Sequence, residues 1–282
     1  MKKNHILEFA LVAMIASLSA CNSNSEAFPS QSYEIKLTSE IIPSRVNDLD
    51  YQSTQIVEGQ KVGVTITGAS GVHNNVAWTA GADGSLTNEG AAIYYKGNSQ
   101  TIITAYHPYN KTWTGTNHVF TVSKDQSTNE GYLASDLLWV TETVTHDETA
   151  VALTFSHKLA KINVTLTSTD ITDLSGATIS ICGTEIAAGF NSATGILSNM
   201  QGAKADIKAG VIANNLTTAS AIIVPQTVEK GTKFIKFTHG DKSYYYALSD
   251  EKEFQSGHAY NYSLRIDSSN MENPLEGEES EW

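Results

Sequence analysis

The chain has 282 residues and a formal charge of −12 at neutral pH, from 18 Lys and Arg against 30 Asp and Glu. This acidity excludes a general nucleic-acid binder, because such proteins need a basic surface to displace counterions from phosphate. A hydrophobic content of 40% is enough for packed cores and excludes wholesale disorder. The length allows one large domain or two small ones.

The first 20 residues predict an export signal. Lys2 and Lys3 precede an apolar run over residues 9–18, which is far shorter than the ~20 residues that a membrane-spanning helix needs. The run ends in Leu-Ser-Ala directly before Cys21, a pattern that a lipoprotein signal peptidase accepts. We therefore expect residues 1–20 to be removed, Cys21 to be acylated (palmitate included) and the lipid to anchor the protein at a membrane. An ordinary secretory signal followed by an incidental Cys is the alternative.

Residues 21–30 are polar and are predicted to form a tether. A strict alternation of apolar and polar residues follows over 33–42 and predicts a half-buried strand. Its apolar face holds Tyr33, Ile35, Leu37 and Ile41. We assign 31–45 to an N-terminal strand and propeptide-like segment.

Further strand candidates recur at short intervals, separated by turn signals. In the first half they are Lys61–Thr67, Ala91–Lys96, Gln100–Tyr106, His118–Ser123 and Asp136–Val140, whereas Asp125–Gly131 shows no periodicity. The alternation restarts at Ala150 and runs to Ile266, and no segment has a clear helical period. We predict an all-β fold of two tandem β-sandwich domains, over 46–145 and 146–267, with an acidic tail over 268–282.

The sequence offers no catalytic pattern. None of the His residues forms a His-x-His or His-Glu-x-x-His motif, so we expect no metal, no other cofactor and no enzymatic activity. His107 and His157 are expected to be structural or exposed. The neighbours Asp147 and Glu148 would point to opposite faces of a strand, which does not suit acid–base catalysis. Cys182 lies in an apolar strand and is expected to act as a small buried hydrophobe.

Three groups of aromatic residues have two interpretations: they could stack on a sugar, or they could be alternating residues of a sheet. The second is favoured. The groups are Tyr94–Tyr95, then Tyr106 with Tyr109 and Trp113, then Tyr244–Tyr246.

Taken in chain order, Cys21 and six later segments resemble the fimbrillin proteins of Bacteroidales. The segments are Gly59–Val64, Ile102–Tyr109, Asp136–Leu138, Val151–Ile162, Val224–Gln226 and Gly257–Tyr262, and residues 155–162 (Phe-Ser-His-Lys-Leu-Ala-Lys-Ile) are the most specific. The resemblance covers most of the chain after Cys21. It implies two stacked β-sandwich domains, export as a lipoprotein, and assembly into surface fimbriae (type V pili) as a structural or tip subunit.

The resemblance also implies an assembly mechanism. In the family, a trypsin-like protease cuts in the loop behind the first strand, that strand is lost, and a strand from the next subunit fills the groove. Here the implied cut falls between Arg45 and Val46, and the implied groove strand carries Tyr33, Ile35, Leu37 and Ile41. An ordinary exposed loop residue is the alternative interpretation of Arg45. The implied partners are other fimbrial subunits in head-to-tail contact, the processing protease, and a receptor on a host or bacterial surface.

The acidic tail departs from the family pattern, in which the C-terminal segment supplies the donor strand. Residues 268–282 contain Pro274 and lack a clean alternation. Either the donor strand is irregular, or this subunit accepts a strand without donating one, as a tip subunit would. The alternative function is an outer-membrane surface lipoprotein that binds glycans through its aromatic clusters without polymerising.

Overall fold

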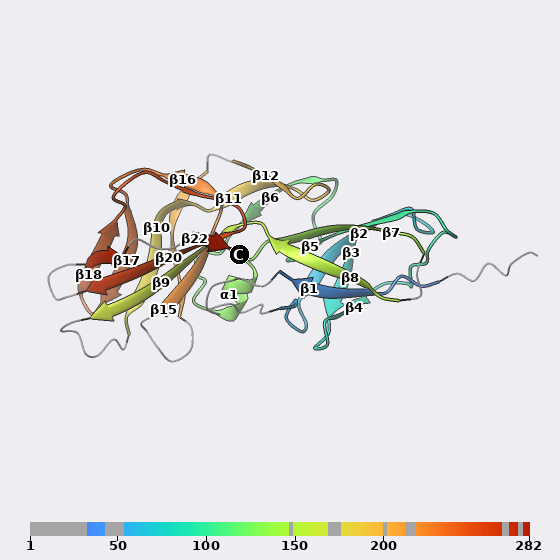
Figure 1. Ribbon diagram of the computed structural model, residues 1–282, viewed down its shortest axis with the longest axis horizontal. Helices are drawn as coiled ribbons and strands as arrows, with labels where there is room; N and C mark the ends of the chain where they lie inside the picture. Colours follow the sequence, from blue (N-terminus) through green and yellow to red (C-terminus); the bar gives the residue numbers. More distant parts are fainter. Residues whose placement is uncertain are drawn as a thin grey trace, which may run out of the picture. The chain divides into compact units, whose positions relative to one another are not determined.

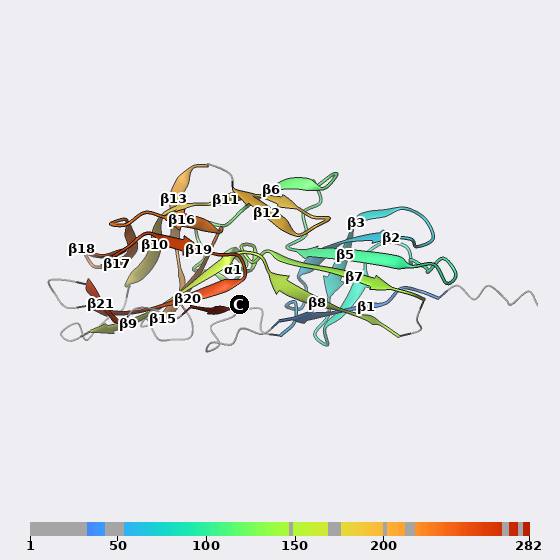
Figure 2. The ribbon, with the colours of Figure 1, turned by 45° about the horizontal axis from the view of Figure 1, so that its top comes forward.

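The computed structural model describes residues 33–42, 54–146, 149–168, 176–199, 202–211, 218–266, 271–275 and 279–282. They belong to one compact unit that spans residues 32–282. Regular structure in these ranges is almost entirely β, which confirms the predicted all-β class (Figures 1 and 2). Cys21, Arg45 and Val46, the predicted lipidation and processing residues, lie outside the described residues.

One group of strands forms a closed barrel in the order β1-β4-β3-β2-β5-β7-β8. Its strands are β1 (Leu37–Ile41), β2 (Lys61–Thr67), β3 (His73–Ala80), β4 (Ser85–Asn88), β5 (Thr101–His107), β7 (Leu138–Val144) and β8 (Val151–His157). The inward residues of these strands form a hydrophobic cluster in which Val62, Val64, Ile103 and Phe155 are fully buried.

The remaining described strands form four sheets around a second hydrophobic cluster, which includes Ile162, Phe234 and Phe237. The largest sheet has the order β14-β15-β9-β20-β21, and β22 also pairs with β20. Its strands are β14 (Gly210–Val211), β15 (Thr218–Ile223), β9 (Ala160–Ser168), β20 (His258–Ile266), β21 (Met271–Leu275) and β22 (Glu279–Glu281).

The smaller sheets complete this part of the chain. One has the order β13 (Lys204–Lys208), β10 (Thr178–Glu185), β17 (Lys233–His239) and β18 (Lys242–Ala247). Another has the order β12 (Ile196–Asn199), β11 (Ala187–Asn191) and β6 (Asn117–Thr121). The last pairs β16 (Gln226–Val228) with β19 (Lys252–Phe254).

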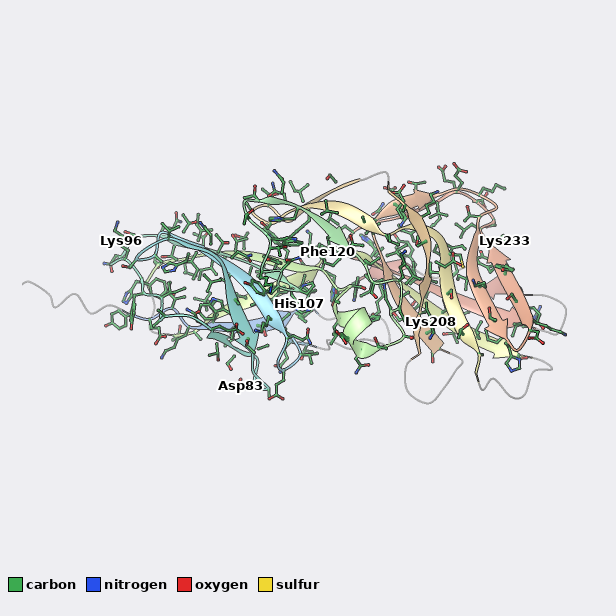
Figure 3. All side chains as sticks on the ribbon, turned by 180° about the vertical axis from the view of Figure 1, so that it is seen from behind. Asp83, Lys96, His107, Phe120, Lys208 and Lys233 are labelled. Carbon is green, nitrogen blue, oxygen red and sulfur yellow. The ribbon has the colours of Figure 1, made fainter. Side chains whose placement is uncertain are left out.

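Two strands pair away from their own half of the sequence. β8 follows the point where the alternation restarts, yet it pairs with β1 and β7 in the barrel. β6 precedes that point, yet it pairs with β11, and its Phe120 joins the second cluster. Figure 3 shows Phe120 among the side chains of this part of the chain.

Two local expectations from the sequence differ from the structure. Residues 129–133 form a short helix, α1 (Asn129–Leu133), because the side chain of Thr128 caps it by accepting a hydrogen bond from the Gly131 N–H at 3.1 Å. A helix this short is invisible to a periodicity count. Residues 91–96 form isolated bridges rather than a strand, with Tyr94 opposite Glu34 and Tyr95 opposite Ala69.

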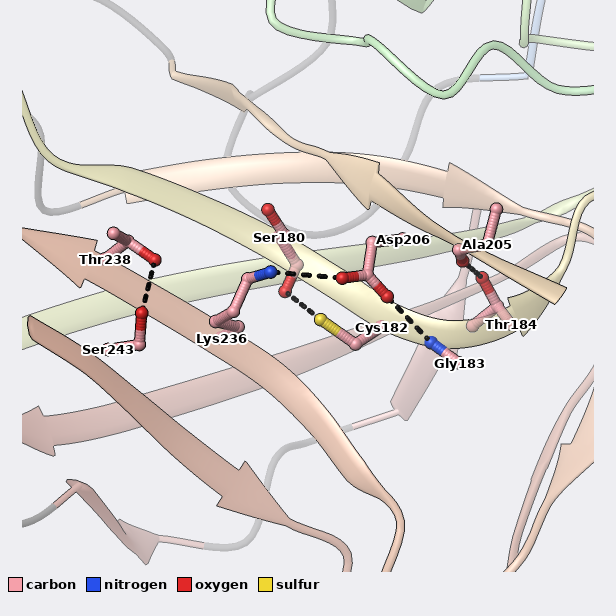
Figure 4. A network of polar contacts seen from close by, with 9 residues as sticks. All are labelled: Ser180, Cys182, Gly183, Thr184, Ala205, Asp206, Lys236, Thr238 and Ser243. Carbon is pink, nitrogen blue, oxygen red and sulfur yellow. Dashed lines mark hydrogen bonds and ion pairs between the residues drawn. The ribbon is translucent and has the colours of Figure 1, made fainter.

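A bulge in β10 explains the environment of Cys182 (Figure 4). The register with β13 shifts between Ile181 and Thr184, and Gly183 takes a positive φ of 71°. The Asp206 carboxylate accepts a hydrogen bond from the Gly183 N–H at 3.4 Å and one from Lys236 Nζ at 3.0 Å. It therefore links the bulged residue of β10 to β17. Cys182 is 6% exposed, as expected of a structural Cys.

Candidate strand-acceptor site

Strand β1 closes the barrel by lying between β4 and β8 (Figure 1). It pairs antiparallel with β4, where Leu37 lies opposite Leu86. It pairs parallel with β8, in register from Leu37 opposite Val151 to Ile41 opposite Phe155. β1 is therefore built into the barrel rather than packed on its outside.

The predicted apolar face of this segment points into the barrel core. Ile35 and Leu37 are each 2% exposed and Ile41 is 3% exposed, whereas Glu40 on the opposite face is exposed. Tyr33 is half-buried against the same cluster, and its ring centroid lies 4.0 Å from that of His146. The alternation along residues 33–41 thus matches the inward and outward faces of a barrel strand.

Main-chain hydrogen bonds hold the segment on both sides. The Ile35 N–H donates to Ile93 O at 2.8 Å, and the Val151 N–H donates to Lys36 O at 2.8 Å. Farther along, the Ser39 N–H donates to Gly84 O at 2.7 Å. Ser39 is buried within the apolar face, and its hydroxyl donates to the same Gly84 oxygen at 3.2 Å, so its polar atom is satisfied.

β8 depends on β1 for most of its pairing. Its register with β7 covers only Ser156 and His157, whereas its register with β1 covers residues 151–155. Loss of β1 would therefore leave the first five residues of β8 without their ladder partner and would expose an edge of β4 at the same time. Unpaired edges of this kind are templates for a new strand.

Two cavities run along β1. One has a volume of about 510 Å³ and is lined by residues 34–38 together with Trp78, Leu86, Ile93 and Ala150. The other has a volume of about 500 Å³ and is lined by residues 38–41 together with Thr54, Gln55 and Asp83. Open space therefore borders the chain along residues 34–41.

The aromatic groups mostly face inward. Tyr95 is 3% exposed, while its neighbour Tyr94 is 39% exposed. Trp113 stacks on Tyr106, at 4.8 Å between centroids, and on His118, at 4.3 Å, so its ring is engaged by two other aromatic rings. Burial raises the pKa of Tyr106 to about 12, and its hydroxyl donates to Asn75 Oδ1 at 2.7 Å.

In the third group, Tyr244 and Tyr246 pack against the core and Tyr245 faces outward at 41% exposure. Lys233 Nζ lies 4.7 Å from the centroid of the Tyr245 ring, which covers that face. This alternation agrees with the interpretation of these tyrosines as sheet residues.

The His residues singled out in the sequence are buried. His107 Nδ1 lies 3.0 Å from Lys61 O, and burial lowers the pKa of its ring, which favours the neutral form. His157 Nδ1 lies 2.8 Å from Asp136 Oδ1, and both side chains are buried. Over the ranges that the structure describes, no group of three or more His, Cys, Asp or Glu is placed to hold a metal ion. No helix in those ranges combines the length and apolar content needed to span a membrane.

The comparisons with known proteins agree on one family. Residues 45–282 match the family model described as fimbrillin-like. The "Putative fimbrium subunit Fim1C" of Bacteroides uniformis is 28% identical over 300 residues, which covers 96% of this chain and 93% of that protein.

Two crystal structures share the fold. A "putative cell adhesion protein" from Bacteroides ovatus has a TM-score of 0.70 at 22% identity and covers 89% of this chain and 98% of its own. A "putative cell adhesion protein" from Bacteroides uniformis has a TM-score of 0.66 at 23% identity, with 88% and 98% covered. Because both identities are low, these structures speak for the fold alone.

Proposed function

The chain belongs to the fimbrillin-like family, and from this premise we propose that it is a structural subunit of a cell-surface fimbria that contributes to adhesion. A relative supports the role, because the protein of Bacteroides uniformis that is 28% identical is named a putative fimbrium subunit. The role needs no catalytic residues. It needs a surface on each subunit that a neighbouring copy can occupy in a repeating head-to-tail contact.

We propose that this surface is the slot that β1 fills, and that assembly proceeds by strand exchange. A trypsin-like protease cuts after Arg45, the segment before Val46 leaves, and a strand from a neighbouring subunit takes the place of β1. The observation that carries the proposal is the position of β1 between β4 and β8, where it closes the barrel.

The energetics favour replacement over an empty slot. Each of Ile35, Leu37 and Ile41 buries apolar surface worth about 1.5–3 kcal/mol, and the vacated main chain of β4 and β8 would lack hydrogen-bond partners. An incoming strand restores both the buried apolar surface and the main-chain hydrogen bonds. Its main chain supplies affinity, and its alternate side chains determine which donor fits. Release is slow when the strand is part of a core, so the contact persists.

Two further features belong to the proposal. Acylation of Cys21 would hold the exported precursor at the outer membrane, and fimbriae would form at the cell surface. The chain would also divide into two tandem β domains, the first of which is the closed barrel rather than a sandwich. The presence of two hydrophobic clusters among the described residues supports this division, with β8 assigned by its pairing to the first domain.

Limited digestion with an Arg-specific trypsin-like protease tests the exchange mechanism. The sequence contains two Arg residues, and Arg265 lies within β20, paired on both sides. The soluble chain that starts after Cys21 should therefore be cut after Arg45 first and acquire Val46 as its N-terminus, read by mass spectrometry. With the other fimbrial subunits present, the cut form should give oligomer ladders on gels.

The control is Arg45→Gln, which keeps β1 and removes the cleavage point. It should stay uncut at this position and monomeric under the same conditions. A wild-type chain that resists cleavage near Arg45, or one that is cut and stays monomeric with its partners present, contradicts assembly by this route.

A further inference from the structure

The tail covers the outer edge of strand β20, where "the tail" denotes residues 271–275 and 279–282. β20 pairs with β9 along one edge and with β21 and β22 along the other. β22 contributes three pairs, from His258 opposite Glu281 to Tyr260 opposite Glu279. The acidic tail that lacks an alternating pattern thus forms strands because β20 supplies a ladder of main-chain partners. Figure 1 shows β22 beside β20.

Trp282 ends the tail in a buried position. Its side chain is 4% exposed, and its ring lies parallel to that of His157, with 3.9 Å between the centroids and 14° between the planes. Its main-chain N–H donates to Gly257 O at 2.8 Å. Lys161 Nζ lies 5.4 Å from the centroid of the indole, within cation–π range.

The residues around Trp282 are themselves fixed. His157 is 3% exposed and bonds Asp136 at 2.8 Å, and Lys161 is 2% exposed within β9. The Gly257 N–H donates to Leu159 O at 2.8 Å, and Ser256 Oγ donates to Lys158 O at 2.7 Å, so the loop before β20 is held as well. Trp282 therefore enters a slot whose walls keep their positions through contacts of their own.

The main-chain register places Glu272 opposite Arg265 and Glu281 opposite His258. A three-residue strand such as β22 forms few hydrogen bonds. The burial of a large aromatic side chain therefore contributes most of the free energy that keeps the strand in place.

We propose that Trp282 is the anchor that holds the tail on β20 in the free subunit, and that it must leave its slot before the tail can pair with another chain. The second half rests on the proposed function and, in addition, on the tail being the strand that this subunit donates. The first half stands without it. Release of the tail would leave the outer edge of β20 without main-chain hydrogen-bond partners, which is unfavourable. The tail therefore stays in place until a competing strand or surface covers that edge.

Hydrogen exchange measured by mass spectrometry on the soluble chain tests the anchor. Trp282→Ala should speed exchange of the amides of residues 279–281, and of residues 258–260 opposite them, by more than about tenfold, since most of the indole burial is lost. Trp282→Phe keeps a ring that can stack on His157, so its exchange rates should lie between those of the wild-type chain and those of Trp282→Ala. Trp113→Phe alters a Trp outside this slot and should leave these amides unchanged.

If Trp282→Ala leaves the exchange rates of these amides unchanged, Trp282 is not the anchor of the tail. The same conclusion follows if Trp113→Phe speeds exchange as much as Trp282→Ala does, because the effect would then reflect a global loss of stability. Donation is then measured by mixing each variant with acceptor subunits already trimmed at Arg45. Faster ladder formation by Trp282→Ala supports release before donation, and equal rates overturn that half. If no variant forms ladders, the proposed function fails while the exchange data still decide whether Trp282 anchors the tail.

Discussion

Cys182 shows how a single side chain takes its chemistry from its surroundings. Burial is the main cause that raises the pKa of its thiol to about 12, and the nearby Asp206 carboxylate acts in the same direction. The thiolate is the reactive form, so this Cys should be inert while the protein is folded.

The expected outcome is slow alkylation. In a soluble Cys21→Ala chain, Cys182 should react with iodoacetamide roughly 1,000-fold more slowly at pH 8 than in urea, since a thiol pKa of about 12 leaves that much less thiolate than the ordinary value does. The rate should climb as the pH approaches 12. Mass spectrometry of the alkylated chain over time measures it. Rapid modification of the folded chain would contradict the burial that the structure shows.

Strand β1 is the element on which the proposed assembly depends, and its two faces have different roles. Leu37 points into the core and lies opposite Leu86, whereas its neighbour Thr38 is half-buried on the other face. The same five residues thus combine a core-filling face with a face that contributes little to packing.

Leu37→Ala should lower the free energy of unfolding of the uncut chain by about 2–5 kcal/mol, because it leaves a cavity in the barrel core. Thr38→Ala is the matched control and should change it by less than about 1 kcal/mol. Urea denaturation followed by tryptophan fluorescence measures both. After cleavage at Arg45 and loss of the segment, the two variants become the same protein and must unfold identically. Equal losses in the uncut variants would mean that β1 is not part of the core.

For the whole molecule, we expect the proposed attachment to the membrane to be separate from folding. The described residues form a compact unit over 32–282, and the proposed lipid site, Cys21, precedes it. Acyl chains contribute about 0.8 kcal/mol for each buried methylene, so loss of the lipid should release the protein without unfolding it.

Cys21→Ser should therefore abolish incorporation of labelled palmitate in cells and move the protein from the detergent phase to the aqueous phase in a detergent partition. Circular dichroism of the purified variant should keep the β signature of the soluble domain. Labelled palmitate on the Cys21→Ser variant would show that Cys21 is not the lipid site.

The all-β class and the inward face of the first strand could be assigned from composition and alternation. Alternation has a period of two in any strand, so Ile35, Leu37 and Ile41 could be assigned to the core without knowledge of their neighbours. The resemblance to fimbrillins, carried by segments such as residues 155–162, was likewise readable from residue order alone.

Which strands pair with one another depends on the tertiary structure. The parallel pairing of β1 with β8 joins residues more than a hundred positions apart, and local pattern carries no information about partners at that distance. The same holds for the tail, whose acidic residues and Pro274 predict no strand. It pairs because β20 offers an open edge and because His157 and Lys161, from two other strands, form a slot for Trp282.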